Sequence, residues 1–408
     1  MIKTLSLFTG IGGFEKALKN IGIEYDLIGY SEIDKYASKS YSVIHEVPET
    51  KNLGDITKIN EKELPKDIDL VTYGFPCQDI SSAGYGKGLF NNDGTLTRSG
   101  LFFHALRIIK ETKPKYAIAE NVKALTSKKF KNEFEIVLKS LDEVGYNNYY
   151  QVLDAKDYGI PQHRERVFIV SIRKDIDNGK FEFPEPFELK LRLKDMLEDE
   201  VDEKYYLSEK QVNSIRTSTY TQNARRIQEK DFCDTLCARD WKDPKCVKVE
   251  PRRIGGLFDT EKSKHQAGAV WDKEYIAPTI DTMQGGYRQP LITEDKNVGF
   301  VEKHYRNFIN KNGYLPELYN PYNEKEIKNV TPTLTTQCNS TTSTNTILKS
   351  DGIRIRKITP KECWRLMGFT DEDFEKAQKI NSNTQLYKQA GNSVCVNVIE
   401  ELFKNLLK

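Results

Sequence analysis

One cysteine, one glutamate and two arginines stand where strands of this sequence begin or end, and together they could support nucleophilic chemistry. Cys77 lies in the stretch GFPCQDIS, directly after the apolar run IDLVTY and the rigid residue Pro76. The seven cysteines are scattered and form no CxxC pair, so we expect reduced thiols. A reduced cysteine is most often a small buried side chain. A nucleophilic thiolate instead needs positive charge or hydrogen-bond donors nearby, because these lower its pKa.

Charged residues that could act on Cys77 occur next to two other strands. In QHRERVFIV, Arg164 and Arg166 alternate at the start of an apolar run, so their side chains point to the same side of an extended chain. In AENV, Glu120 and Asn121 end another apolar run, which would place the carboxylate near Cys77 if the strands are neighbours. Plainer interpretations remain open: the arginines could form a solvated edge, and Glu120 could cap a helix.

A glycine-rich turn near the N-terminus indicates a bound nucleoside. Gly10, Gly12 and Gly13 in LFTGIGGF separate a strand from a helix and let a ligand approach the helix N-terminus. Glu32 ends the second strand about twenty residues later, where nucleotide-binding folds accept hydrogen bonds from ribose hydroxyls. Asp55 is a second acid that could hold an adenine edge. Without a P-loop lysine, the pattern favours a nucleoside-bearing cofactor over a nucleoside triphosphate.

The elements that must position these residues alternate between strands and helices. The predicted strands cover residues 4–8, 25–32, 68–75, 114–122, 149–155 and 166–173. Helical spacing of apolar residues appears between them, notably at 99–112 and 134–145. This alternation predicts an α/β fold with a mostly parallel sheet that helices cover on both faces. The last segment, 393–408, has its apolar residues on one face, so we expect an amphipathic helix that docks on the rest of the protein.

The patterning divides the chain into three segments. It weakens near Phe183, stays rich in Thr, Asn, Gly and Pro, and returns after Ile353. We therefore predict that 1–183 and 351–408 complete one catalytic and cofactor-binding domain, with 184–350 as a smaller, loop-rich, β-containing domain. The middle segment carries a loose threefold repeat, which predicts three similar hairpins whose turns could form one working surface.

Composition excludes several classes of protein. The net charge of +2 over 408 residues means that any nucleic-acid surface is local. No apolar run approaches a membrane span, and the first residues do not form a signal peptide, so we expect a cytoplasmic protein. A zinc site at Cys233, Cys237, Cys246 and His265 would have a spacing that fits no common pattern, so we predict no metal.

Nine segments in this order resemble the motifs of the DNA cytosine methyltransferases, which form 5-methylcytosine from S-adenosylmethionine. The segments span nearly all of residues 1–173 and 354–408 and read LFTGIGGF, SEIDKYA, GDITKI, GFPCQDIS, SGLFFHALRII, AENV, QHRERVFIV, ITPKECWRLMGF and QLYKQAGNSVCVNVI. The resemblance implies a Rossmann-like S-adenosylmethionine-dependent methyltransferase domain with a separate target recognition domain. It indicates the bacterial or phage restriction-modification type.

The resemblance also implies a reaction for the cysteine, the glutamate and the two arginines described first. The Cys77 thiolate attacks carbon 6 of cytosine, Glu120 engages ring nitrogen 3, and Arg166 holds the carbonyl oxygen. Arg164 supports the site electrostatically, and Asn121 orders the loop. The cytosine must be flipped out of the duplex. The stretch SSAGYGKGLFNNDGTLTRSG, after Cys77, resembles the mobile loop that closes over the flipped base.

The cofactor, S-adenosyl-L-methionine, is assigned to fourteen residues by the same resemblance. Glu32 would hold the ribose and Ile33 would pack on the adenine. The set is Phe8, Gly10, Ile11, Gly12, Gly13, Glu32, Ile33, Asp55, Ile56, Pro76, Leu101, Asn392, Ser393 and Val394. The last three would return to the first domain from the far end of the chain.

Double-stranded DNA is the partner that the resemblance implies. Gln284, Arg288, Gln337 and Asn339 lie in the repeat turns and are of the types that read base edges in the major groove. A restriction endonuclease acting on the same site would be a further partner, and we expect a monomer. Two alternatives remain open: a tRNA cytosine methyltransferase, which would have a shorter middle segment, and a catalytically inactive DNA-binding relative.

Overall fold

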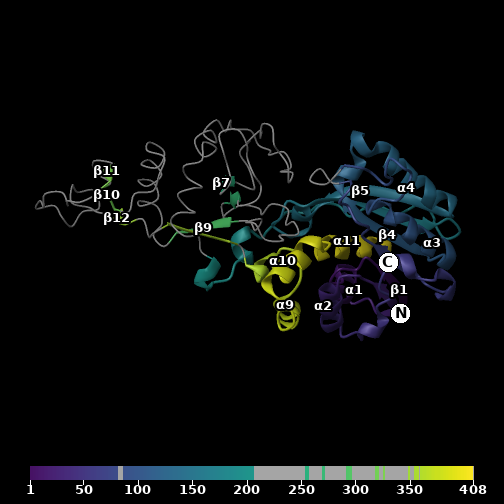
Figure 1. The fold of residues 1–408 in the computed structure, drawn as a ribbon, viewed down its shortest axis with the longest axis horizontal. Helices are drawn as coiled ribbons and strands as arrows, with labels where there is room; N and C mark the ends of the chain where they lie inside the picture. Colours follow the sequence, from purple (N-terminus) through teal and green to yellow (C-terminus); the bar gives the residue numbers. More distant parts are fainter. Residues whose placement is uncertain are drawn as a thin grey trace, which may run out of the picture. The chain divides into compact units, whose positions relative to one another are not determined.

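The computed structural model describes residues 1–80, 86–205 and 359–407, together with the backbone of short strands between 253 and 357. The chain divides into two compact units (Figure 1). The first unit contains Met1–Leu191 and Pro360–Lys408, and most of the chain between them forms the second. The sequence predicts domain boundaries at 183 and 351 and a role for each of the three segments. These boundaries and roles stay predictions.

A six-stranded sheet forms the centre of the first unit, in the order β2-β1-β3-β4-β6-β5. Its neighbours pair in parallel from β2 to β4, whereas β6 is antiparallel to both β4 and β5. Only β6 therefore runs against the other five, which confirms the prediction of a mostly parallel sheet. The strands are β1 (Ile2–Leu7), β2 (Tyr25–Ser31), β3 (Leu70–Tyr73), β4 (Tyr116–Val122), β5 (Tyr146–Asp154) and β6 (Glu165–Arg173).

The reversal of β6 matters for the site. In a parallel sheet the carboxyl ends of the strands meet at one edge, where ligand chemistry collects. Because β6 is reversed, its first residues lie at that same edge: Arg166 is opposite Val122, the last residue of β4. Side chains before and at the start of β6 can thus reach groups that follow β3 and end β4.

Helices cover both faces of the sheet, as predicted. Leu5 and Leu7 of β1 face a core that includes Ile108 and Ile109 of α3 and Val137 of α4. On the opposite face of β1, Ser6 is buried, and so is Glu15 of α1. The helices before the second unit are α1 (Gly13–Asn20), α2 (Lys35–His45), α3 (Phe102–Thr112) and α4 (Lys131–Glu143).

The C-terminal segment completes the first unit with α8 (Pro360–Arg365), α9 (Asp371–Gln378), α10 (Asn383–Asn392) and α11 (Val396–Leu406). Helix α11 packs along α1 (Figure 1), and the rings of Phe14 and Phe403 have centroids 6.4 Å apart. A nearly buried ion pair, Lys16–Asp373 at 2.6 Å, joins α1 to α9. The buried residues of α11 lie on one face, which confirms the predicted amphipathic docking helix: Val396, Val398, Ile399, Leu402, Phe403 and Leu406.

The second unit contains two small sheets among its described strands, in the orders β13-β9-β8-β7 and β11-β10-β12. The strands are β7 (Arg253–Gly256), β8 (Ala269–Trp271), β9 (Leu291–Asp295), β10 (Leu318–Asn320), β11 (Lys325–Glu326), β12 (Leu348–Lys349) and β13 (Ile353–Lys357). Several predicted residues lie outside the described parts of the chain: Gln284, Arg288, Gln337, Asn339, Cys233, Cys237, Cys246 and His265. Among the helices that are described, none is long and apolar enough to cross a bilayer.

Candidate active site

Cys77 lies at the carboxyl edge of the sheet, and hydrogen bonds fix the chain on both sides of it. It follows β3 by a short turn, and the side-chain amide of Asn121 on β4 donates a 3.0 Å hydrogen bond to the carbonyl of Phe75. Asn121 is buried, so this bond replaces water and fixes the approach to the cysteine. On the downstream side, the amide of Ile80 donates to the Cys77 carbonyl at 3.0 Å and closes a turn. Asn121 therefore orders the chain around Cys77, which is the role that the resemblance implies.

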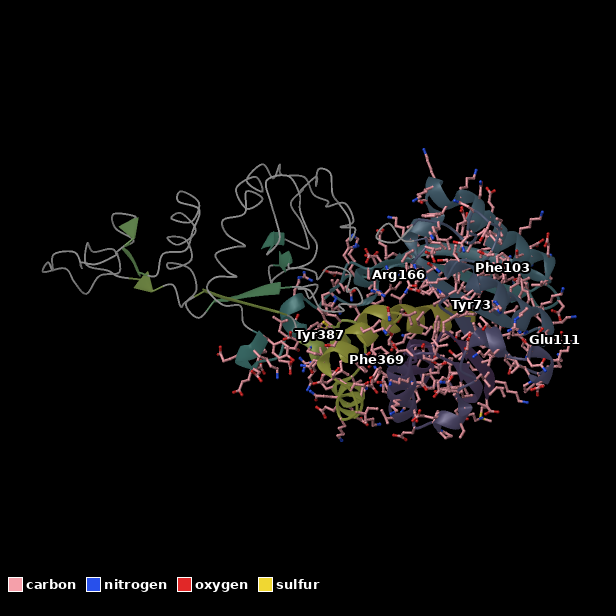
Figure 2. The ribbon with its side chains drawn as sticks, in the orientation of Figure 1. Tyr73, Phe103, Glu111, Arg166, Phe369 and Tyr387 are labelled. Carbon is pink, nitrogen blue, oxygen red and sulfur yellow. The ribbon has the colours of Figure 1, made fainter. Side chains whose placement is uncertain are left out.

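Glu120 and Arg166 form an ion pair at the same edge. Arg166 Nε lies 3.0 Å from Glu120 Oε1, and both side chains are less than one-fifth exposed. Figure 2 labels Arg166 among the side chains of the first unit. The pairing of β4 with β6 explains the contact, because Arg166 stands opposite Val122 and is thus diagonal to Glu120 on one face. A second nitrogen of the guanidinium, Nη1, donates to the Glu165 carbonyl at 2.8 Å. The pair places a carboxylate and a planar hydrogen-bond donor side by side.

Arg164 is buried and braces the returning C-terminal segment. Its Nη2 donates to the carbonyls of Gly391 at 3.1 Å and Ser393 at 2.8 Å. Burial, together with the positive charge of Arg166, lowers the pKa of Arg164 to about 9. The guanidinium is therefore still cationic at neutral pH. Arg164 thus links the surroundings of Cys77 to the segment that was predicted to hold the cofactor.

The charges of these residues act on the Cys77 thiol, but burial has the largest effect. Burial raises the pKa of Cys77 and outweighs the lowering by Arg166 and Arg164. The carboxylate of Glu120 raises it further. This differs from the expectation that the arginines produce a thiolate, because the sequence does not show how little water reaches the sulfur. At neutral pH the thiol is therefore the resting form.

Part of the segment predicted as a mobile loop is folded. Residues 89–97 form a small hairpin, in which Phe90 pairs with Leu96 and the Asn91 amide donates to the Thr95 carbonyl at 2.8 Å. Leu89 is fully buried in the main core. Residues 81–85, directly after the Cys77 turn, lie outside the described residues.

The glycine-rich turn has the backbone conformation that the sequence predicts. Gly10 and Gly12 have φ values of 56° and 81°, and Phe8 also has a positive φ of 55°, which is uncommon for a residue with a side chain. A methyl group on Gly10 would meet no atom within 4 Å, whereas one on Gly12 would collide with the ring of His45. The turn therefore leaves space for a ligand beside Gly10, whereas Gly12 packs against the ring of His45.

His45 supports this turn from behind. Its Nε2–H donates to the Ile11 carbonyl at 3.0 Å, and burial lowers the pKa of His45 to about 4, so the ring is neutral. In front of the turn, Glu32 Oε2 accepts the Gly10 amide at 2.8 Å and Oε1 accepts the Asp34 amide at 2.7 Å. Burial raises the pKa of Glu32.

The residues around Glu32 fit a nucleoside. Each carboxylate oxygen of Glu32 has a lone pair left for a ribose hydroxyl. Ile33 is 75% exposed beside it and offers an apolar surface to a flat base. Asp55 receives the Thr57 amide and hydroxyl on Oδ1, and these bonds lower its pKa. Ile56, which was predicted to contact the adenine, is buried in the core, and its carbonyl accepts a hydrogen bond from Arg107 Nη2 at 2.7 Å.

The returning segment reaches the glycine-rich turn. A methyl group on Gly13 would lie 2.6 Å from Val394 Cγ2 and 3.3 Å from Ser393 Oγ, so these residues pack against the glycine. Asn392 is exposed next to them. The structure thus places Ser393 and Val394 beside the turn, whereas Pro76 and Leu101 are half-buried near the catalytic edge.

Comparison with known proteins decides which family this arrangement belongs to. The sequence matches the C-5 cytosine-specific DNA methylase family over residues 2–408. The chain belongs to this family. It is therefore a DNA cytosine-5 methyltransferase that uses S-adenosylmethionine and acts on DNA.

Similar proteins are found in phages and bacteria. An orphan methyltransferase of Bacillus phage rho11s is 34% identical, with 100% of this chain and 98% of that protein covered. A type II methyltransferase of Haemophilus parahaemolyticus is 31% identical, with 99% and 94% covered. Among solved structures, the Dnmt2 methyltransferase of S. pombe has a TM-score of 0.61 at 18% identity, with 100% and 98% covered, which shows a shared fold. These matches confirm the predicted Rossmann-like methyltransferase fold.

Two residues of this methyltransferase, the half-buried His45 and the buried Asp79, were not singled out from the sequence. His45 supports the glycine-rich turn, and no local pattern marks it, because its partner Ile11 is 34 residues away. Asp79 is buried two residues after Cys77 and bonds to Arg98. The position of Asp79 inside GFPCQDIS was the available signal, since a carboxylate that is buried there needs a charged or hydrogen-bonding partner.

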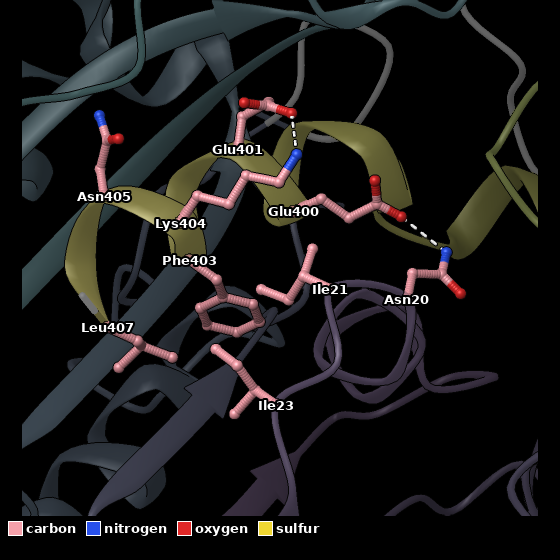
Figure 3. A pocket seen from close by; sticks show the side chains of 9 residues that line it. All are labelled: Asn20, Ile21, Ile23, Glu400, Glu401, Phe403, Lys404, Asn405 and Leu407. Atoms are coloured by element: carbon pink, nitrogen blue, oxygen red, sulfur yellow. Dashed lines mark hydrogen bonds and ion pairs between the residues drawn. The ribbon is translucent and has the colours of Figure 1, made fainter.

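A surface groove of about 600 Å³ lies elsewhere on the first unit (Figure 3). It runs between the end of α1 and the end of α11. Asn20 of α1 contacts Glu400 of α11 at 2.6 Å, and a second contact, Glu401–Lys404 at 2.7 Å, lies within α11. Its apolar floor includes Ile21, and no lining residue belongs to the predicted catalytic or cofactor sets. The groove is therefore separate from the candidate active site.

Proposed function

We propose that this methyltransferase modifies cytosine within a specific sequence of duplex DNA, through a transient bond between Cys77 and carbon 6 of a flipped base. The observation that carries the proposal is the grouping of Cys77 with the Glu120–Arg166 ion pair at the carboxyl edge of the sheet. A nucleophile, a carboxyl group and a hydrogen-bond donor are the three groups that activation of cytosine requires.

Each residue has a defined part in the reaction. Carbon 5 of cytosine is a poor nucleophile, and addition of the Cys77 sulfur to carbon 6 makes it enamine-like. Glu120 engages nitrogen 3 as negative charge builds in the ring, and Arg166 holds the neighbouring carbonyl oxygen. S-adenosylmethionine, when bound, supplies an electrophilic methyl group. Water then takes the proton from carbon 5, and the electron pair of that bond forms the ring double bond and expels the Cys77 thiolate.

The limited exposure of Cys77 supports flipping of the base. Cys77 is only partly exposed, and its thiol is largely shielded from water. A cytosine stacked inside a duplex cannot bring carbon 6 to such a sulfur, so the nucleotide must rotate out of the helix. The glycine-rich turn, Glu32 and Ser393 would hold the cofactor next to it.

The relatives support a role in marking DNA. Relatives of this chain are described as orphan methyltransferases of Bacillus phages and as type II methyltransferases of bacteria. We propose that residues 184–350 select the target sequence and that Gln284, Arg288, Gln337 and Asn339 read bases. Methylation would then protect the site from a cognate restriction endonuclease where one is present. A monomer acting in the cytoplasm suits this role.

Mapping of the product tests the proposal. Purified protein is incubated with S-adenosylmethionine and either mixed-sequence duplex DNA or tRNA, and modified cytosines are located by bisulfite sequencing. We expect methylated cytosines in one short DNA motif and none with Cys77→Ser. Methylation of tRNA alone would favour the RNA-modifying alternative. Absence of methylation on both acceptors, with cofactor binding intact, would favour the inactive relative.

A further inference from the structure

Asp79 connects the Cys77 turn to the far end of the loop that follows it. Its side chain is 3% exposed, and its backbone is bonded on both sides. The Asp79 amide donates to Ser99 Oγ at 3.3 Å, and its carbonyl accepts the Gly88 amide at 2.9 Å. Both partners lie beyond residues 81–85, so Asp79 binds the chain that leaves the loop.

Arg98 completes this connection with a bidentate contact between its guanidinium and the Asp79 carboxylate. Its backbone amide and Nε donate to Asp79 Oδ2 at 3.1 and 3.2 Å, and Nη2 donates to Oδ1 at 3.1 Å. These bonds lower the pKa of Asp79, so its carboxylate is ionised and the hydrogen bonds are charge-assisted. The Arg98 side chain is half exposed, whereas that of Asp79 is not.

The connection leads from the nucleophile toward the cofactor. Ser99 begins a 3-10 helix, Ser99–Leu101, and Leu101 is one of the predicted cofactor-lining residues. Helix α3 follows directly, and its first residue, Phe102, is fully buried in the main core. A displacement of Asp79 would thus move Cys77 relative to a rigid helix that borders the cofactor side.

We propose that Asp79 and Arg98 form a positioning clamp that sets the Cys77 sulfur relative to the cofactor side of the site. The inference rests on the proposed function. Asn121 fixes the chain before Cys77, and the Asp79 clamp fixes the chain after it. Methyl transfer requires carbon 5 of the Cys77-bound base to meet the methyl group in line, and a displacement of about 1 Å can lower the rate roughly 100-fold.

A set of three variants tests the clamp. Asp79→Asn keeps the shape of the side chain and removes its charge. Arg98→Lys keeps the positive charge for any DNA phosphate and removes the bidentate contact. Asp93→Asn is the matched control, because Asp93 is exposed in the hairpin turn of the same loop and bonds only Thr95 among the described residues.

Steady-state kinetics give the first measurement. We expect Asp79→Asn to lower kcat about 10- to 100-fold, with KM for DNA and cofactor within about 3-fold of wild type. Arg98→Lys should lower kcat by a smaller factor, and Asp93→Asn should stay within about 2-fold. A kcat for Asp79→Asn within 2-fold of wild type would overturn the clamp.

Alkylation of cysteines gives a second measurement that does not depend on methylation. The wild-type and variant proteins are treated with iodoacetamide, and each cysteine peptide is quantified by mass spectrometry. Release of the clamp admits water and reagent to the half-buried Cys77, so its alkylation in Asp79→Asn should accelerate about 10-fold. Cys363 and Cys395 are buried and report on general loosening. Acceleration of all three cysteines together, or of none, would overturn the clamp even if no methylation is found.

Discussion

Replacement of Gly13 by alanine tests the junction between the cofactor turn and the returning C-terminal segment. The added methyl group would lie 2.6 Å from Val394 Cγ2 and 3.2 Å from the Val394 carbonyl oxygen. Two carbon atoms in ordinary contact are about 3.5–4.0 Å apart, so at least one of the two segments must move.

The size of the effect follows from two opposing contributions. Overpacking of a core contact costs about 1–3 kcal/mol. Alanine favours the helix over glycine by at most about 1 kcal/mol, and Gly13 is the first residue of α1. We therefore expect Gly13→Ala to lower the free energy of unfolding by about 1–2 kcal/mol.

Urea unfolding of a double-mutant cycle measures this contact. Val394→Ala removes the atom that the new methyl group meets, so the double variant should be about 1 kcal/mol more stable than the sum of the single effects predicts. Gly10→Ala is the control, because its methyl group meets nothing within 4 Å and its cost comes only from the positive φ of 56°. The Gly10 and Val394 changes should therefore add. Additive effects for Gly13 and Val394 would refute the proposed packing.

Two further predictions concern catalysis and pH. Glu120→Gln breaks the ion pair with Arg166 and should lower kcat at least 100-fold with cofactor affinity unchanged, because general acid-base groups contribute about 10²–10⁴-fold. A loss of kcat below about 10-fold in a steady-state assay would exclude Glu120 from proton chemistry. The pKa of His45 is about 4 in the fold against an ordinary value of 6.5, so the unfolded chain binds a proton that the native protein does not as the pH falls through this window. Stability should therefore be full above pH 6.5 and should fall below it, and the wild type should lose up to about 3 kcal/mol more than His45→Gln between pH 7 and pH 4. Equal pH dependence of the two proteins in urea unfolding would contradict a buried neutral His45.

Much of the architecture could be predicted because it is recorded in local patterns. The run LVTY forms β3 with all four residues buried, and two glycines of LFTGIGGF, Gly10 and Gly12, adopt positive φ values. The one-sided apolar pattern of the last segment predicts α11 without any information on its partner, α1. These features depend on residues a few positions apart, which periodicity can detect.

Other features depend on contacts between distant parts of the chain. The reversal of β6, which brings Arg166 beside Glu120, is a matter of strand pairing that no single segment specifies. Arg164 donates to the carbonyl of Gly391, 227 residues away. The raised pKa of Cys77 was also missed, since its cause is the amount of surrounding protein and not the type of any neighbouring residue. The sequence thus names residues that the structure brings to one edge of the sheet, Cys77, Glu120 and Arg166, whereas it does not give their protonation or their hydrogen-bond partners.

The most direct test of the account is whether Cys77 bonds to the target base. The protein is incubated with S-adenosylmethionine and a duplex that carries 5-fluorocytosine at the methylated position, where fluorine replaces the proton that must leave. We expect a stable protein–DNA adduct whose peptide maps to Cys77, and no adduct with Cys77→Ala. An adduct at another cysteine, or continued methylation by Cys77→Ala, would contradict the assignment of Cys77 as the nucleophile.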